Sequence, residues 1–69
     1  MKVNIDMLTE KMGERGMNME DLASKVGVHR ATMYRKLAAG GGDITVKQVA
    51  SIQNALNLTT DECVAIFLN

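Results

Sequence analysis

Residues 18–37 contain the feature that most restricts how this chain can fold, two short helical patterns separated by a single glycine. The first pattern opens with Asn18, a residue type that caps helices well, and Asp21 falls at the third helical position. Its apolar residues recur at the spacing of an inward helix face: Leu22, Ala23 and Val26. Gly27 then stands where this helix must end, because glycine adopts the left-handed conformation of a sharp turn at little cost. The pattern predicts a helix over about 19–26, a tight turn and a second helix.

The second helix of this pair, predicted over about 30–38, has two different faces. Met33 and Leu37 lie four residues apart and form an inward face, which Val28 extends as a buried plug just before the helix. A separate arc of the helical wheel holds the outward side chains: Arg30, Ala31, Tyr34, Arg35 and Ala38. One face can pack while the other presents hydrogen-bond donors, which is what a helix in the major groove of DNA requires.

Before this pair, a helix is predicted from about Ile5 to Arg15, with Asn4 as its cap and Gly16 as its stop. Its expected inner face consists of Ile5, Leu8 and Met12. The six methionines divide into residues that fit the core (Met12, Met17 and Met33) and residues expected to be more exposed (Met1, Met7 and Met19).

After the pair, Thr45 is predicted to cap a helix that ends near Asn57 and whose apolar stripe is Val49, Ile52 and Leu56. Thr59, with Glu62 three residues on, is a capping-box candidate for a last helix through about Ile66. No segment shows the alternation of a strand, and the chain has no proline. We therefore predict an all-α fold, a compact five-helix bundle that forms one domain over residues 1–69.

Together these patterns resemble the phage Cro/repressor-like helix-turn-helix family, and in particular short Cro-like regulators of temperate phages of Gram-positive bacteria. The matching residues are Ala23, Gly27, Val28 and Met33 at their relative spacings, and the resemblance extends over roughly residues 4–67. It implies a bundle of the lambda-repressor type with its helix-turn-helix at about 18–38. Many relatives have Gln at the start of the second helix, where it contacts phosphate, whereas this chain has Met19.

The net charge of zero argues against nucleic-acid binding at first sight, because such domains are usually basic. The distribution of the charges removes this objection. Between Leu22 and Gly42 there are four cations and no acid, and the acids lie on either side of this stretch. Phosphates respond to the local positive charge, since salt screens charges more than about 8–10 Å away.

The predicted DNA contacts fall into two groups. Base-reading residues are expected on the outward arc and just before it: His29, Arg30, Ala31, Tyr34 and Arg35. Phosphate contacts are expected from flanking groups, of which the glycines resemble the family's second phosphate clamp: Lys25, Thr32, Lys36, Gly41, Gly42 and Lys47. Each has a structural alternative: Arg35 as a solvated charge, Tyr34 as half-buried filler, and the glycines as a permissive loop.

The composition indicates neither an enzyme nor a cofactor-binding protein. One histidine and Cys63 make neither a metal site nor a nucleophile with its base, so we expect no enzyme, no metal and no cofactor. A lone cysteine forms no internal disulfide, and there is no signal-like or membrane-spanning run, so a cytoplasmic, nucleoid-associated location in a bacterial host is expected.

The expected partner is double-stranded DNA, bound by a sequence-specific transcriptional regulator that occupies an operator. A domain of this size reads about one half-site, which favours a homodimer on a pseudo-palindromic operator. Ile66, Phe67 and Leu68 are consecutive apolar residues, and they are predicted as the dimer surface. The alternative is a protein-binding module, an anti-repressor or antitoxin, that reuses the same fold.

Overall fold

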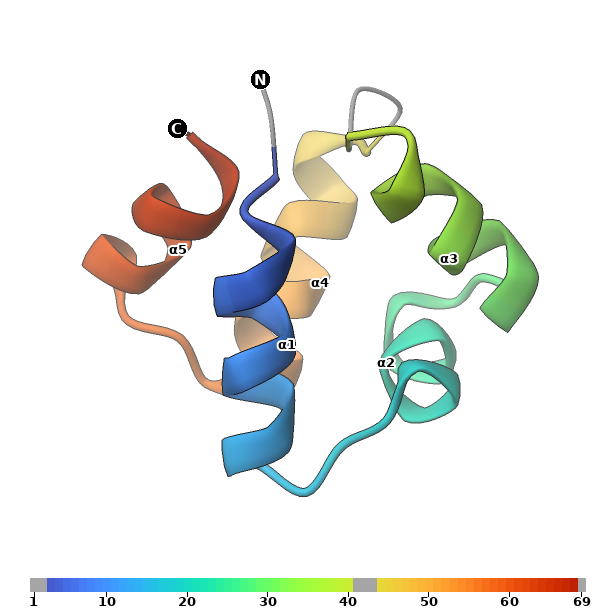
Figure 1. Cartoon of the computed structure of the whole chain (residues 1–69), viewed down its shortest axis with the longest axis horizontal. Coiled ribbons are helices and arrows are strands. Elements are labelled where there is room, and N and C mark those ends of the chain that lie inside the picture. Colours follow the sequence, from blue (N-terminus) through green and yellow to red (C-terminus); the bar gives the residue numbers. More distant parts are fainter. Residues whose placement is uncertain (1–2, 41–43, 69) are drawn as a thin grey trace.

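The chain forms five helices within the residues that the computed structural model describes, 3–40 and 44–68 (Figure 1). In chain order they are α1 (Ile5–Glu14), α2 (Met19–Val26), α3 (Arg30–Ala38), α4 (Val46–Leu56) and α5 (Thr60–Phe67). These residues contain no strand, so the predicted all-α, five-helix fold is confirmed. Figure 1 shows α3 and α5 at opposite sides of the molecule, with α1 and α4 between them.

A polar side chain begins each of α1, α2, α4 and α5, at the residue that the sequence predicted. In α2 the Asn18 Oδ1 accepts from the Asp21 N–H at 2.8 Å, and the Asp21 carboxylate accepts from the Asn18 N–H at 3.2 Å. The same reciprocal pairing begins α4 at Thr45 and α5 at Thr59. Each cap contributes about 0.5–2 kcal/mol, because it gives a partner to an N–H that the helix itself leaves unpaired.

The turn between α2 and α3 has the predicted left-handed residue. Gly27 has a φ of +87°, and its N–H donates to the Ala23 carbonyl at 2.9 Å. The Val28 N–H donates to the same carbonyl at 3.0 Å, which closes the end of α2 and directs the chain into α3. Val28 is half-buried and packs against the core, so it partly fills the role of the predicted plug.

The buried core draws on all five helices, and within the described residues it contains no polar side chain. Its members are Val3, Leu8, Met12, Leu22, Ala23, Met33, Leu37, Ile44, Ile52, Leu56, Leu58, Ile66 and Phe67. The inward faces predicted for the second, third and fourth helices all contribute to it. The hydrophobic periodicity therefore identified most of the core correctly.

Three expectations about apolar residues near the surface need correction. Ile5 was predicted to face inward but is 38% exposed, because it opens α1 and borders a shallow hollow beside Tyr34. Met7 and Met19 were expected to be exposed but are half-buried against the core. Met1 lies outside the described residues.

The prediction that Ile66 and Phe67 form a dimer surface is wrong. Their side chains are 0% and 1% exposed, and only Leu68, at 63%, lies on the surface. The physical reason is that α5 has neighbours on two sides. It packs on α1, and it lines a groove together with α4, so two successive side chains find cover within one chain.

The segment before α1 connects regions that are distant in the sequence. The Val3 N–H donates to the Gly40 carbonyl just after α3 at 3.0 Å, and the Asn4 N–H donates to the Ile66 carbonyl in α5 at 2.7 Å. Val3 is 4% exposed, so this segment is part of the core as well as of the hydrogen-bond network.

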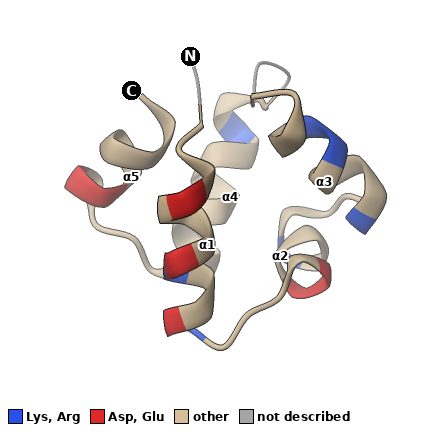
Figure 2. Cartoon of the chain, in the orientation of Figure 1, with Lys and Arg blue, Asp and Glu red and all other residues tan. Residues whose placement is uncertain are grey.

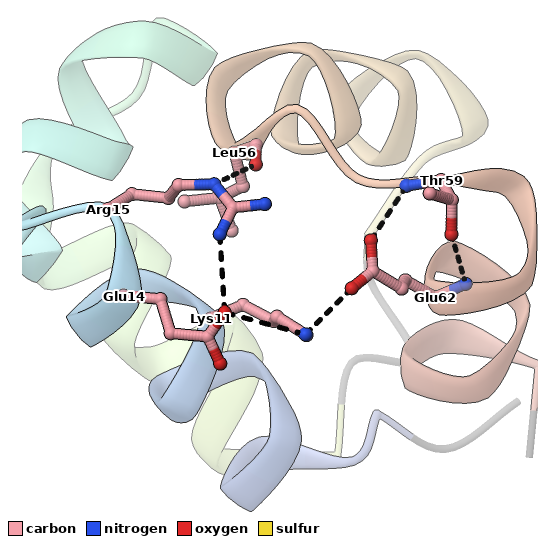
Figure 3. Close-up of polar contacts among 6 residues, drawn as sticks. All are labelled: Lys11, Glu14, Arg15, Leu56, Thr59 and Glu62. Atoms are coloured by element: carbon pink, nitrogen blue, oxygen red, sulfur yellow. Dashed lines mark hydrogen bonds and ion pairs between the residues drawn. The ribbon is translucent and has the colours of Figure 1, made fainter.

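The end of α1 is tied to the end of α4 through an arginine (Figure 3). Arg15 Nε donates to the Leu56 carbonyl at 2.9 Å, and Arg15 Nη1 lies 3.3 Å from a Glu14 carboxylate oxygen. The last carbonyls of a helix have no partner within it, so the guanidinium both satisfies one of them and joins two helices.

Candidate nucleic-acid interface

The outward face of α3 carries the predicted base-reading residues. Arg30, Ala31, Tyr34 and Arg35 are exposed, as is His29 just before the helix, whereas the inward side chains of the helix are buried. Ala38, on the same arc, is exposed as well. The two-faced helix is therefore present as the sequence predicted.

The charges are divided between different parts of the molecule (Figure 2). Lys and Arg positions mark α3, which has no acid, while Asp and Glu positions mark α1, α5 and the beginning of α2. α3 therefore has a net positive charge within a neutral chain, although other cations lie on α1, α2 and α4 (Lys11, Lys25 and Lys47).

The relative position of α2 and α3 depends on small and apolar residues at their contact. Ala23 is 1% exposed and Leu22 is fully buried, and both come from the face of α2 that packs on the rest of the bundle. Met33 of α3 is also fully buried. A short side chain at Ala23 and the turn at Gly27 let α3 cross close to α2, and this sets which side chains of α3 face outward.

His29 is the N-cap of α3, a role that the sequence analysis missed. Its backbone is extended, with φ −70° and ψ 147°, and its Nδ1 accepts from the Ala31 N–H at 3.1 Å. Histidine is not among the preferred capping residues, so its type gave no such signal. The imidazole is thereby held at the start of the outward face.

A hollow with both apolar and polar lining residues lies between α2 and the start of α3. Its lining residues are Glu20, Ala23, Ser24, Val28, His29 and Arg30. Glu20 is an exception to the predicted separation of acids from the DNA-facing region, because it borders the same hollow as His29 and Arg30. In the sequence Glu20 precedes the stretch without acids, but the fold brings its carboxylate beside α3.

Tyr34 combines the two alternatives considered for it. Its side chain is 66% exposed, yet it also lines a shallow apolar hollow between α1 and α3, together with Ile5 and Met19. The ring therefore borders apolar residues, and most of its surface is exposed and can contact a ligand.

The predicted phosphate-contacting residues do not all lie together. Lys25 lines a hollow with Ser51 and Asn54 of α4, so it lies on the side of α2 that faces α4. Thr32 and Lys36 are half-buried on α3, and Lys47 is exposed in the first turn of α4. Gly41 and Gly42 lie outside the described residues.

An apolar groove runs between α4 and α5. It is lined by Ile44, Val46, Val49, Gln53, Thr60, Cys63, Val64 and Leu68. Val46 is 87% exposed and Val64 is 45% exposed, so apolar area reaches the surface here. Burial raises the pKa of the Cys63 thiol.

No described helix has the length and apolar character needed to cross a membrane. Among residues 3–40 and 44–68, no three His, Cys, Asp or Glu side chains gather where they could hold a metal ion.

Comparison with protein families finds one whose model, described as the Cro/C1-type HTH DNA-binding domain, matches residues 7–64. The matched region runs from α1 into α5 and so includes the α2–turn–α3 unit and the outward face of α3. Searches of curated proteins and of solved structures give no significant match.

Proposed function

Because the chain belongs to the Cro/C1-type helix-turn-helix DNA-binding domains, we propose that it is a sequence-specific transcriptional regulator that acts by occupying an operator. The observation that carries this proposal is the outward face of α3, where Arg30, Tyr34 and Arg35 are exposed and no acid occurs within the helix. Occupancy is the mechanism, since a bound domain excludes polymerase from the same DNA.

The two arginines are proposed to read separate base pairs. They lie five residues apart, about 7.5 Å along a helix axis, which corresponds to about two base-pair steps of B-DNA. Arginine forms a fork of donors that fits O6 and N7 of guanine, the commonest specific contact in the major groove. Ala31 and Tyr34 lie between them on the wheel, and each offers apolar surface to a thymine methyl group.

Phosphate contacts are proposed for Thr32 and Lys36 of α3 and for Lys47 in the first turn of α4. Gly41 and Gly42 belong to the same proposal through their place in the sequence, between α3 and α4. Lys25 is proposed to contribute less, because it lies beside α4 rather than with the cations of α3. Contacts of this kind set affinity and register without reading sequence.

A homodimer is proposed for binding to a pseudo-palindromic operator, with recognition helices about 34 Å apart. One copy reads about one half-site, which gives little specificity against a genome. The groove between α4 and α5 is the proposed contact surface, with exposed Val46, Val64 and Leu68 at its rim. Leu68 is retained from the sequence prediction, and the buried Ile66 and Phe67 are not.

The biological role that fits this proposal is a phage Cro-like or repressor-type switch protein, located with the chromosome in the cytoplasm of a bacterial host. The same apolar groove also favours a second candidate, a module that grips a protein partner, as an anti-repressor or antitoxin does.

Selection of bound sites from random duplex DNA tests the main proposal. The expected outcome is a pseudo-palindrome whose half-sites lie about 10–10.5 bp apart from centre to centre. A variant that lacks both Arg30 and Arg35 is the control and should enrich no sequence. Failure of the parent protein to enrich any sequence would favour the protein-binding candidate.

A further inference from the structure

The beginning of α1 lies beside α3. The Val3 N–H donates to the Gly40 carbonyl just after α3 at 3.0 Å, so the chain enters α1 next to the end of α3. A hollow of about 180 Å³ lies between the two helices. Its lining residues are Ile5, Leu8, Thr9, Met19, Tyr34, Leu37 and Ala38. α1, α2 and α3 therefore all contribute to a surface that includes Tyr34 of the outward arc.

Apolar side chains form most of this hollow, and the Tyr34 ring borders it. Leu8 and Leu37 are buried, at 1% and 4% exposure. Ile5 and Tyr34 are 38% and 66% exposed, so they lie at its rim. None of the described lining residues is charged, and Thr9 is the one polar side chain among them besides Tyr34. The apolar part of the ring therefore has an apolar surface beside it, while the hydroxyl requires a polar partner or water.

We propose that Ile5 is a positioning residue for DNA recognition, which with Met19 forms the wall that supports the Tyr34 ring. This inference rests on the proposed function and deepens it, because it adds α1 to the elements that determine recognition. Ile5 does not need to touch DNA for this purpose. It acts through Tyr34, whose rigid ring has only two side-chain torsions, so that support along the ring also fixes the direction of the hydroxyl.

Ile5 is suited to this purpose because the backbone beside it is fixed. The Asn4 Oδ1 accepts from the Met7 N–H at 3.1 Å, and the Asn4 N–H donates to the Ile66 carbonyl at 2.7 Å. The side chain of Ile5 is also stiff, since a β-branched residue in a helix has one strongly preferred rotamer. A wall with few alternative conformations restricts the ring more than a flexible side chain would.

Met19 forms the adaptable part of the same wall. It is the first residue of α2 and is half-buried against the core. An unbranched thioether fills irregular gaps and makes favourable contacts with aromatic rings. The position of Tyr34 therefore depends on how three helices meet. A ring that is ordered before binding loses less conformational entropy when DNA is bound, so the complex is more stable.

The composition makes Tyr34 directly observable, since the chain has one tyrosine and no tryptophan. The anisotropy of the intrinsic fluorescence therefore reports the motion of this ring. Ile5→Ala removes most of the proposed wall, and Ile5→Val keeps the β-branched part of it. Met7→Ala is the matched control, because Met7 is a half-buried residue of the same helix that is not among those lining the hollow.

We expect Ile5→Ala to lower the anisotropy of Tyr34 in the free protein. It should also weaken binding to the duplex that the parent selects from random DNA, by about threefold to tenfold. Ile5→Val should retain most of both properties. Met7→Ala should change neither when measured well below its melting temperature, although both alanine variants should melt below the parent.

A double-mutant cycle separates support of the ring from any other effect of Ile5. In the background of Tyr34→Ala, Ile5→Ala should have no further effect on affinity for the same duplex, because the residue acts through the ring. An equal loss of affinity with and without the Tyr34 ring would overturn the inference, as would an unchanged anisotropy in Ile5→Ala.

The proposed function would survive either of these results if the parent protein selected a sequence and Arg35→Ala altered one of its base pairs. If the parent selected no sequence at all, the proposed function would fail, and the role of Ile5 in recognition would fail with it.

Discussion

Lys11 Nζ lies 2.7 Å from Glu62 Oε2, and this ion pair joins α1 to the first turn of α5 (Figure 3). The other oxygen of the same carboxylate accepts from the Thr59 N–H at 2.9 Å. Glu62 therefore completes the capping box of α5 and also binds a residue of α1. The hydrogen bond from Lys11, aided by that from Thr59, lowers the pKa of Glu62 from 4.5 to about 2, and the pKa of Lys11 is raised in turn.

Because the pKa of Glu62 is lowered in the folded state, the fold should lose stability in acid. A pKa that is lower in the folded state contributes stability above about pH 4.5, and this contribution disappears as the pH falls toward 2. Glu62→Gln keeps a capping-box residue but loses the charge. Its melting temperature should be below that of the parent at pH 7, with the difference closing between pH 4.5 and 2. Glu10→Gln, which removes an exposed carboxylate of α1, serves as the control, and a difference that persisted at pH 2 would contradict this explanation.

Gly27→Val should destabilise the fold through its backbone. The φ of +87° costs an L-residue about 1–2 kcal/mol, and a Cβ at this position would meet no atom within 4 Å, so no clash contributes. The expected fall in melting temperature is about 4–8 °C for each kcal/mol. Gly13→Ala is the matched control, since Gly13 lies inside α1 with open space around it and alanine stabilises a helix by about 0.5–1 kcal/mol.

Arg35→Ala should change recognition and leave folding intact, because the side chain is exposed. The expected loss is about 1–3 kcal/mol of discrimination at one base pair. Arg15→Ala provides the opposite case: it should lower the melting temperature by removing the bond to the Leu56 carbonyl, while the preferred sequence stays the same. Binding-site selection and thermal unfolding of both variants check the pair, and an Arg35 variant that bound all sites as the parent does would remove α3 from the recognition surface.

Operator binding should weaken steeply with salt although the net charge is zero. If each subunit neutralises about three phosphates, a dimer makes about six contacts, and log K against log salt should slope by roughly −5. Lys47→Gln should flatten the slope by nearly two units, one contact from each subunit. Lys25→Gln removes the same charge on the side of α2 that faces α4, so its slope should change little. A parent slope near zero would mean that phosphates are not the ligand.

Substitutions of Leu68 and Phe67, which were both predicted to form the dimer surface, should have different effects on self-association and on stability. Leu68→Asp should weaken self-association, measured by the dependence of DNA binding on protein concentration, and leave the melting temperature of the monomer close to that of the parent, because Leu68 is 63% exposed. Phe67→Ala should cost about 3–5 kcal/mol of stability, since its side chain is 1% exposed. Concentration-independent binding by the parent would argue against the dimer.

Features that depend on neighbouring residues in the sequence were predicted well. The caps at Asn18, Thr45 and Thr59 and the turn at Gly27 follow from the chemistry of a few successive residues, and the structure has them where expected. Helix periodicity likewise identified Met33 and the other inward side chains of α3, and so the outward arc as well.

Features that depend on which helices meet were not predicted. The burial of Phe67 requires cover from two sides of α5, and the bond from Arg15 to Leu56 joins residues that are far apart in the chain. Glu20 came close to His29 only because α2 and α3 cross. A helical wheel shows the faces of one helix but carries no information on what lies opposite each face.

The hydrogen bonds of Val3 and Asn4 also affect the order in which parts of this protein can fold during its synthesis. Their partners are the carbonyls of Gly40, just after α3, and of Ile66, in α5. The Ile66 carbonyl is therefore available to the Asn4 N–H only after almost all of the described chain has been synthesised. α2, α3 and Gly40, the partner of Val3, are synthesised earlier, and only the hydrogen bond of Asn4 requires α5. A nascent chain stalled before α5 would therefore contain α2 and α3, which pack on each other, while the start of α1 would lack one of its two backbone partners.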